Sequence, residues 1–184
     1  MTPLIRRLAL LGCVALCVSA FAAEPLSILG YTKSTSFWVE LPPGWRCDPD
    51  AGKQSGAMFV LLPQEFTFDS APVAIVATSF QESRLDEAMK KDRASFLDQD
   101  PEMQVSDLNP VATKSGARFS VREFRSQRLK QQGFEAVAYT QLGPDVVVLT
   151  LSAQTETRLR DGQKIFRKVL STFENAKLKV ATSQ

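Results

Sequence analysis

Carboxylates are the side chains of this chain best suited to chemistry, because the usual catalytic groups are missing. The sequence contains no histidine and three cysteines. Without histidine, Ser-His-Asp and Cys-His catalysis are excluded, together with the commonest metal ligand. Two carboxylates could still hydrolyse a glycoside as acid and base. The candidates on predicted strands and loops are Glu40, Glu65, Asp69, Glu123 and Glu135, and no sequence spacing brings two of them together.

Motifs that would bind a cofactor or a metal are missing as well. The chain has no G-x-G-x-x-G after a predicted strand, no G-x-x-x-x-G-K-[ST], no G-x-S-x-G and no C-x-x-C. Asp48-Pro49-Asp50 resembles the start of a calcium loop, but no further ligands follow at the required spacing. Asp and Pro favour turns, so we interpret this segment as a turn. We expect no catalytic, cofactor-binding or metal-binding residue.

Two groups of side chains are candidates for a binding surface. The aromatic group would form an exposed partner surface or pack in the core, and consists of Trp38, Trp45, Phe66 and Phe68. The basic group would bind an anionic partner or form the solvated face of a sheet, and consists of Arg118 and Arg122, followed by Arg125, Arg128 and Lys130. It lacks the interleaved aromatics of nucleic-acid platforms. Core packing and a solvated face are the interpretations that we favour, and no nucleic acid is expected as a partner.

The first 22 residues are typical of a secretory signal peptide. Arg6 and Arg7 precede an apolar run over 8–18, and Ser19-Ala20-Phe21-Ala22 supplies small residues before a cut after Ala22. The apolar run is shorter than the roughly 20 residues that span a bilayer, so we expect no membrane anchor after cleavage. Lipidation at Cys13 is the alternative, although the residues that follow it stay apolar.

Cleavage changes the inventory of the exported chain. Cys13 and Cys17 leave with the signal, so Cys47 remains alone and cannot form an internal disulfide. It is either buried and inert or available to another molecule. The mature chain keeps 20 basic and 20 acidic side chains, so no net charge draws it to nucleic acid or anionic lipid. We expect a periplasmic or secreted protein.

Hydrophobic periodicity predicts a single domain over 35–174, between a lead-in over 23–34 and a flexible tail over 175–184. Strands are expected over 28–31, 37–41, 45–47, 57–62, 73–79, 103–108, 117–124, 134–141 and 146–151, with polar loops over 48–56 and 63–72. Helices are expected over 83–97, with a capping box from Ser83 to Asp86, and over 157–173. Because turns rather than helical crossovers join the strands, we predict an α+β fold, an antiparallel sheet packed with two main helices.

The strand order and several short motifs resemble the Mog1/PsbP-like superfamily, including its bacterial DcrB-type exported proteins. The most specific motif is Leu41-Pro42-Pro43-Gly44-Trp45, and the others are a helix ending in Phe96-Leu97, Gly116-Ala117-Arg118-Phe119 and Leu170-Ser171-Thr172-Phe173. The resemblance covers 35–173 and implies an α-β-α sandwich. Its members share protein binding without a common set of catalytic residues, so it transfers no functional residue to this chain.

Three functions follow from these observations. The first is a non-catalytic exported accessory or binding protein that engages another envelope or secreted protein. The second is a periplasmic protein that binds a small ligand or lipid between sheet and helix, in a pocket lined by aromatics such as Trp38 and Phe66. The third is a histidine-free carboxylate hydrolase. The sequence favours the first, because the chain lacks histidine and the catalytic motifs named above.

Overall fold

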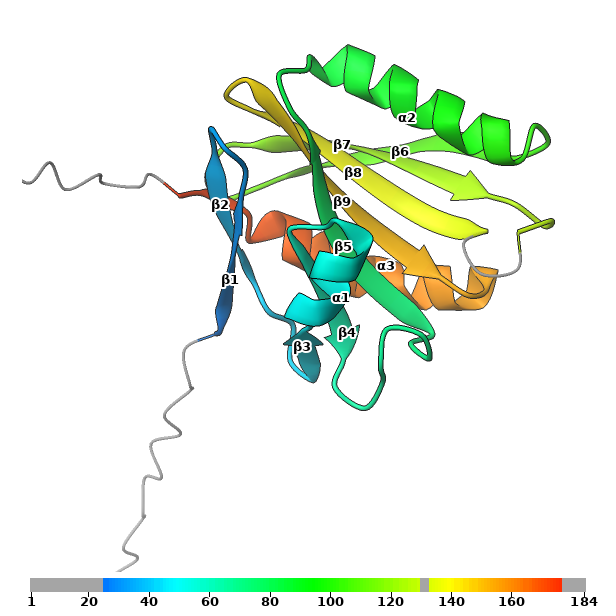
Figure 1. Ribbon diagram of the computed structural model, residues 1–184, viewed down its shortest axis with the longest axis horizontal. Helices are drawn as coiled ribbons and strands as arrows, with labels where there is room; N and C mark the ends of the chain where they lie inside the picture. The colour runs from blue at the N-terminus through cyan, green and yellow to red at the C-terminus, as the bar shows by residue number, and fades with distance from the viewer. Residues whose placement is uncertain (1–24, 130–132, 177–184) are drawn as a thin grey trace, which may run out of the picture.

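The computed structural model describes residues 25–129 and 133–176 (Figure 1). Several predictions lie outside the described residues: the signal peptide over 1–22, Cys13, Lys130 and residues 177–184 of the tail. Within the two described ranges, no helix is long and apolar enough to cross a membrane.

Seven strands form the main antiparallel sheet, in the order β3-β4-β5-β9-β8-β7-β6. They are β3 (Trp45–Cys47), β4 (Phe59–Pro63), β5 (Val73–Phe80), β6 (Gln104–Ala112), β7 (Arg118–Arg125), β8 (Phe134–Leu142) and β9 (Asp145–Ala153). Strands β6 to β9 are neighbours in chain order, which confirms the antiparallel meander that the short turns predicted. The central strands β5 and β9 are apolar on both faces because both faces are packed.

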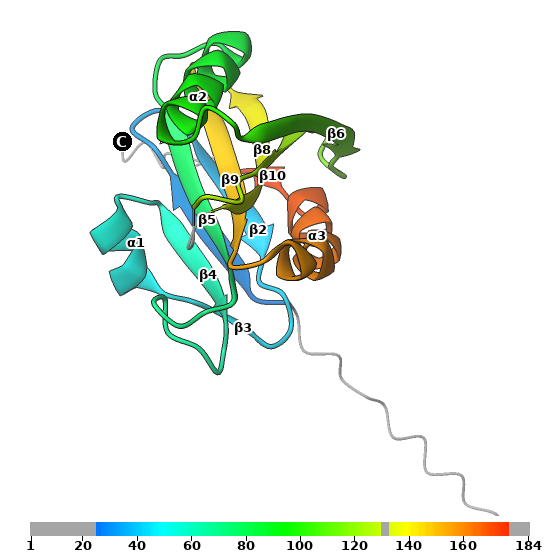
Figure 2. The same cartoon turned by 90° about the vertical axis from the view of Figure 1, so that its right-hand side faces the viewer.

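The side chains of β9 alternate between the two faces and divide the core. Leu149 and Leu151 face α3 (Glu156–Ser171), whereas Val146 and Val148 face α2 (Leu85–Gln99). Figures 1 and 2 show these two helices on opposite sides of the sheet. The order helix, sheet, helix confirms the predicted α+β sandwich, in which each helix buries one apolar stripe.

A second sheet contains β1 (Ser27–Tyr31), β2 (Ser36–Glu40) and β10 (Glu174–Asn175). Gly30 is required there, because a Cβ atom would lie 2.3 Å from the Cζ atom of Phe37. Phe37 in turn stacks on Phe173 with ring centroids 4.8 Å apart, which ties this sheet to the core on the α3 side. Asn175 was predicted to begin the flexible tail, but it pairs with Phe37 in β2.

The polar loop predicted over 48–56 is wrong, because this segment contains the short helix α1 (Pro49–Ser55). The Asp48 carboxylate accepts a hydrogen bond from the Ala51 N–H, and Pro49 occupies the first turn, where no N–H donor is needed. Gly56 ends the helix with φ 68°. Asp and Pro start helices as well as turns, and here the burial of Ala51 against β4 and β5 decides for the helix.

Two further boundaries differ from the prediction. The capping box does not form, since α2 has Arg84 as its N-cap without a side-chain hydrogen bond. The strand predicted over 103–108 continues as β6 to Ala112, through an irregularity in the pairing between Leu108 and Val111. Pro110 lies within this irregularity, which β6 accommodates because it is an edge strand.

Candidate functional site

A groove of about 610 Å³ lies on the face of the main sheet that carries α1 and α2. The end of α1, the β4–β5 loop and strands β5, β8 and β9 form it. Its apolar lining includes Phe68, Ala71, Ala74 and Val76, and its polar lining consists of Ser55, Asp69, Glu135, Thr150, Ser152 and Gln154. The lining contains two acidic residues and no Lys or Arg.

Small side chains in the middle of the sheet leave the groove open. Ala74, Ser152 and Glu135 form one row across β5, β9 and β8. Further along the same face, Val148 and Tyr139 fill the space under α2. Where alanine and serine replace these larger residues, the side chains are too short to fill the space above the sheet, and no residue of α2 lines the groove.

Glu135 is the most buried ionisable group of the groove, with 8% of its surface exposed. Burial raises its pKa to about 7, the hydroxyl of Ser152 opposes this rise, and the negative charge of Asp92 adds to it. No salt bridge among the described residues includes Glu135. Near neutral pH, this carboxyl group is therefore divided between its protonated and ionised forms, and within 25–129 and 133–176 no cation forms a salt bridge with the ionised form.

A second group of ionisable side chains lies under α2, on the same face as the groove. Tyr139 is fully buried, and its hydroxyl group donates a hydrogen bond to the Asp92 carboxylate of α2. Burial raises the pKa of Asp92, and the hydrogen bond from Tyr139 and the charge of Arg122 only partly offset it. Burial and the negative charge of Asp92 also raise the pKa of Tyr139. Arg122 contacts Asp107 at 2.8 Å and donates to the Met89 carbonyl, so it fastens α2 to the sheet.

The four aromatic residues of the candidate binding surface are not brought together. Trp45 is 5% exposed and belongs to the core, which confirms the core interpretation for this residue. Trp38 is 40% exposed on β2, in the three-stranded sheet. Phe66 packs beside α1, and Phe68 lines the groove. Of the four, Phe68 alone lies at the groove.

The two basic residues of the candidate surface also have different surroundings. Arg118 is exposed at the start of β7. Arg122 was predicted on the same solvated face, but α2 covers that face and leaves its side chain 16% exposed. The next two cations of the run contact acids, Arg125 with Glu123 and Arg128 with Asp100. The described part of the run therefore holds the fold together rather than forming one basic patch.

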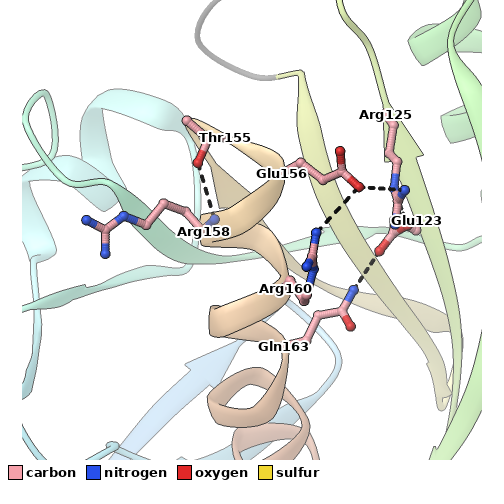
Figure 3. A network of polar contacts seen from close by, with 7 residues as sticks. All are labelled: Glu123, Arg125, Thr155, Glu156, Arg158, Arg160 and Gln163. Atoms are coloured by element: carbon pink, nitrogen blue, oxygen red, sulfur yellow. Dashed lines mark hydrogen bonds and ion pairs between the residues drawn. The ribbon is translucent and has the colours of Figure 1, made fainter.

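Glu123, unlike Glu135, is a buried carboxylate whose partners are complete. It is 3% exposed, and its two oxygens contact Arg125 Nε and Gln163 Nε2, each at 2.6 Å (Figure 3). Arg125 also donates to Glu156 at 3.0 Å. This network fastens α3 to β7 and leaves its buried carboxylate no need of an external ligand.

The carboxylates named from the sequence lie in different parts of the structure. Glu135 and Asp69 line the same groove, Glu40 lines another pocket, and Glu65 is exposed in the β4–β5 loop. The sequence did not identify the groove itself or its hydroxyl residues Thr150 and Ser152. The signals that could have found it are a glutamate inside the apolar strand 134–142 and polar residues at the end of an apolar one.

Other features of the described residues offer less chemistry. A smaller, mostly apolar pocket of about 350 Å³ lies against the Pro42-Pro43-Gly44 turn, and neither of its ionisable residues, Glu40 and Lys168, is buried. Burial, assisted by Asp48, raises the pKa of the free Cys47 thiol. In the part of the chain that the structure describes, no three potential ligands cluster to hold a metal ion.

Solved structures share this fold at low sequence identity. The solution structure of cyanobacterial PsbP (CyanoP) from Synechocystis sp. PCC 6803 matches with a TM-score of 0.54 and 15% identity, over 89% of this chain and 99% of that one. A crystal structure from Bacteroides thetaiotaomicron VPI-5482 matches with a TM-score of 0.44 and 14% identity, over 77% and 46%. No family model and no curated protein sequence matches the chain. The similarity to CyanoP supports a PsbP-like fold.

Proposed function

We propose that this protein is a non-catalytic exported binding protein that engages another envelope or secreted protein through the groove. The observation that carries the proposal is a buried carboxyl group, Glu135, that lines a groove and has no salt bridge in the part of the chain that the structure describes. Burying an ionised group without a partner destabilises a fold. Buried ionisable groups with strongly shifted pKa values are concentrated at functional sites.

A binding role is favoured over hydrolysis by two carboxylates. Glu135 and Asp69 line the same groove. An acid–base pair needs both carboxylates held in fixed positions beside the substrate, whereas Asp69 is exposed in the β4–β5 loop and no salt bridge among the described residues holds it. If the purified protein cleaves aryl glycosides, and Glu135→Gln and Asp69→Asn each abolish the cleavage, the non-catalytic proposal is wrong.

Site-specific photo-crosslinking tests the protein partner. A photoreactive phenylalanine analogue at Phe68 stands at the groove, and the same analogue at Tyr31, which is 68% exposed on β1, is the matched control. In cells that produce the protein, we expect a discrete adduct from position 68 that is weaker or missing at position 31. Equal adducts at both positions, or an adduct only at position 31, would place the contact elsewhere.

A small-ligand role is the second candidate, and the groove volume favours it. About 610 Å³ falls within the range of roughly 300–1,000 Å³ that is typical of small-molecule sites. Native mass spectrometry of the purified protein tests it. A co-purifying mass that Phe68→Ala removes supports this role, and a uniformly empty protein favours the protein partner.

Export is the remaining part of the proposal, and the sequence over 1–22 supports it. Amino-terminal sequencing and intact mass of the protein from the periplasm or medium test it. We expect a chain that begins at Ala23. Recovery in the cytoplasm with residues 1–22 attached contradicts export, and an added lipid mass at Cys13 supports the lipoprotein alternative.

A further inference from the structure

Among the described residues, the charged side chains that line the groove are acidic. Glu135 and Asp69 line it, and Asp92 lies close enough to raise the pKa of Glu135. The nearby cation Arg122 is held against Asp107 at 2.8 Å. Negative charges that line a concave surface attract a positive ligand and repel an anionic one.

We propose that the groove binds a cationic amine carried on an apolar stem, with the Glu135 carboxylate as its counter-ion. This inference rests on the proposed function and names the ligand class of the same site. A primary ammonium group provides the positive charge that the groove lacks and three hydrogen-bond donors.

The lining suits both ends of such a ligand. Glu135 and the hydroxyl groups of Thr150 and Ser152 provide acceptors on the sheet surface. Ala74 and Val76 on β5 provide an apolar surface beside them, against which methylene groups pack while the ammonium group reaches the carboxylate. A metal ion is a poorer occupant, because no three potential metal ligands cluster within 25–129 and 133–176.

Glu135 also makes amine binding depend on pH. The titratable or charged groups around it are Asp92 on α2, Tyr139 on β8, Arg122 on β7 and Asp69 on the β4–β5 loop. Tyr139, whose pKa is raised, stays neutral between pH 6 and 8. With the pKa of Glu135 at about 7, its ionised fraction rises about tenfold over this range, and the affinity for an amine should rise by the same factor.

The experiment compares hexylammonium with 1-hexanol, which has the same stem and no charge. The purified protein is titrated with each at pH 6 and pH 8, and binding is followed through the backbone amide signals of β8 and β9 in NMR spectra. The variants are Glu135→Gln, which keeps the shape of the side chain, and Glu65→Gln, an exposed glutamate outside the groove, as the control. The fold of each variant is checked in the same spectra.

The expected result is saturable binding of hexylammonium that is about tenfold weaker at pH 6 than at pH 8. Glu135→Gln should abolish both the preference for the amine over hexanol and the pH dependence, whereas Glu65→Gln should retain both. Equal binding of hexanol and hexylammonium, or a Glu135→Gln variant that binds the amine like the wild type, overturns the inference. Neither result removes the proposed function, which the crosslinks at Phe68 test separately.

Two sources of the ammonium group are distinguished in the same assay. Lysine amide acetylated on its α-amino group, which keeps the charged ε-ammonium group, represents a lysine side chain of a partner protein. The compound 1,6-diaminohexane represents a free organic amine. Tighter binding of the lysine derivative assigns the group to a partner protein, and tighter binding of the diamine assigns it to a small ligand. Either result supports the cationic class, and failure of both amines to bind at pH 8 overturns it.

Discussion

The stability of this protein should depend on the ionisation of Glu135, in a direction opposite to that of most carboxylates. Its pKa is raised from 4.5 to about 7 in the folded protein. Between these two values, the folded state holds the proton more tightly than the unfolded chain does. The free energy of unfolding therefore falls as pH rises through this window. At about 1.4 kcal/mol for each pKa unit, the full loss above pH 7 is about 3 kcal/mol.

Replacing Glu135 by glutamine removes this loss and keeps the shape of the side chain. We expect Glu135→Gln to match the wild type near pH 4.5 and to exceed it by about 3 kcal/mol at pH 8.5. For a chain of this size, that difference corresponds to a rise in melting temperature of about 6–12 °C. The variant should thus be more stable and, if the groove binds amines, defective in binding.

Urea denaturation at a series of pH values measures the effect. The fluorescence of the buried Trp45 reports unfolding, and the free energy is extrapolated linearly to zero urea. Comparing the two proteins at each pH cancels the titration of shared groups that do not interact with Glu135, such as Asp145. Glu65→Gln, in an exposed loop, should show no such divergence. A difference between Glu135→Gln and the wild type that stays constant from pH 4.5 to 8.5 would refute the reasoning.

Three other predictions concern parts of the fold outside the groove. Burial opposes ionisation of Asp145, but hydrogen bonds from Ser34, Thr32 and the Glu82 N–H outweigh it and lower its pKa, so stability should fall as pH drops below the ordinary range of an aspartate. Asp145→Asn should cost about 2–4 kcal/mol in urea denaturation at pH 7, whereas the exposed Asp86→Asn should cost little. Gly30→Ala should lower the free energy of unfolding by about 1–3 kcal/mol in thermal denaturation, because its Cβ would collide with the buried ring of Phe37. Adding Phe37→Leu should recover part of this loss. A Gly30→Ala variant as stable as the wild type would contradict this contact. Iodoacetamide should label Cys47 slowly in the native protein and quickly in urea, since burial raises the pKa of its thiol. Peptide mass spectrometry measures the labelling rates, and equal rates in the two conditions would contradict the prediction.

Local sequence patterns predicted most of the architecture, because they depend on neighbours in the chain. The alternation in β9 and the apolar stripe of α3 follow directly from the periods of strand and helix. The short helix over 49–55 was missed, since its cap and proline also fit a turn and only burial against β4 and β5 separates the two. The extension of β6 was missed because Pro110 normally ends a strand, and the edge position that tolerates it is a property of the sheet.

The candidate site could be predicted only in part. Glu135 and Asp69 were among the carboxylates named from the sequence, but their residue numbers differ by more than sixty, and only the sheet order brings them to one groove. The fold also separates the four residues of the proposed aromatic surface, because sequence proximity does not determine which side chains meet in space. Trp45 is in the core, whereas Phe68 is at the groove.

The signal-like start, the missing histidine and the single cysteine beyond residue 22 are properties of the sequence alone, and they direct attention from catalysis towards binding. Which carboxylate matters was decided by the tertiary structure. Glu123 and Glu135 both occur in strands of the main sheet, but strand alternation and pairing turn them to opposite faces. Glu123 meets Gln163, forty residues away in the chain, whereas Glu135 lines the groove. A buried charge is neutralised by whatever lies across from it in space, and sequence neighbours do not determine that.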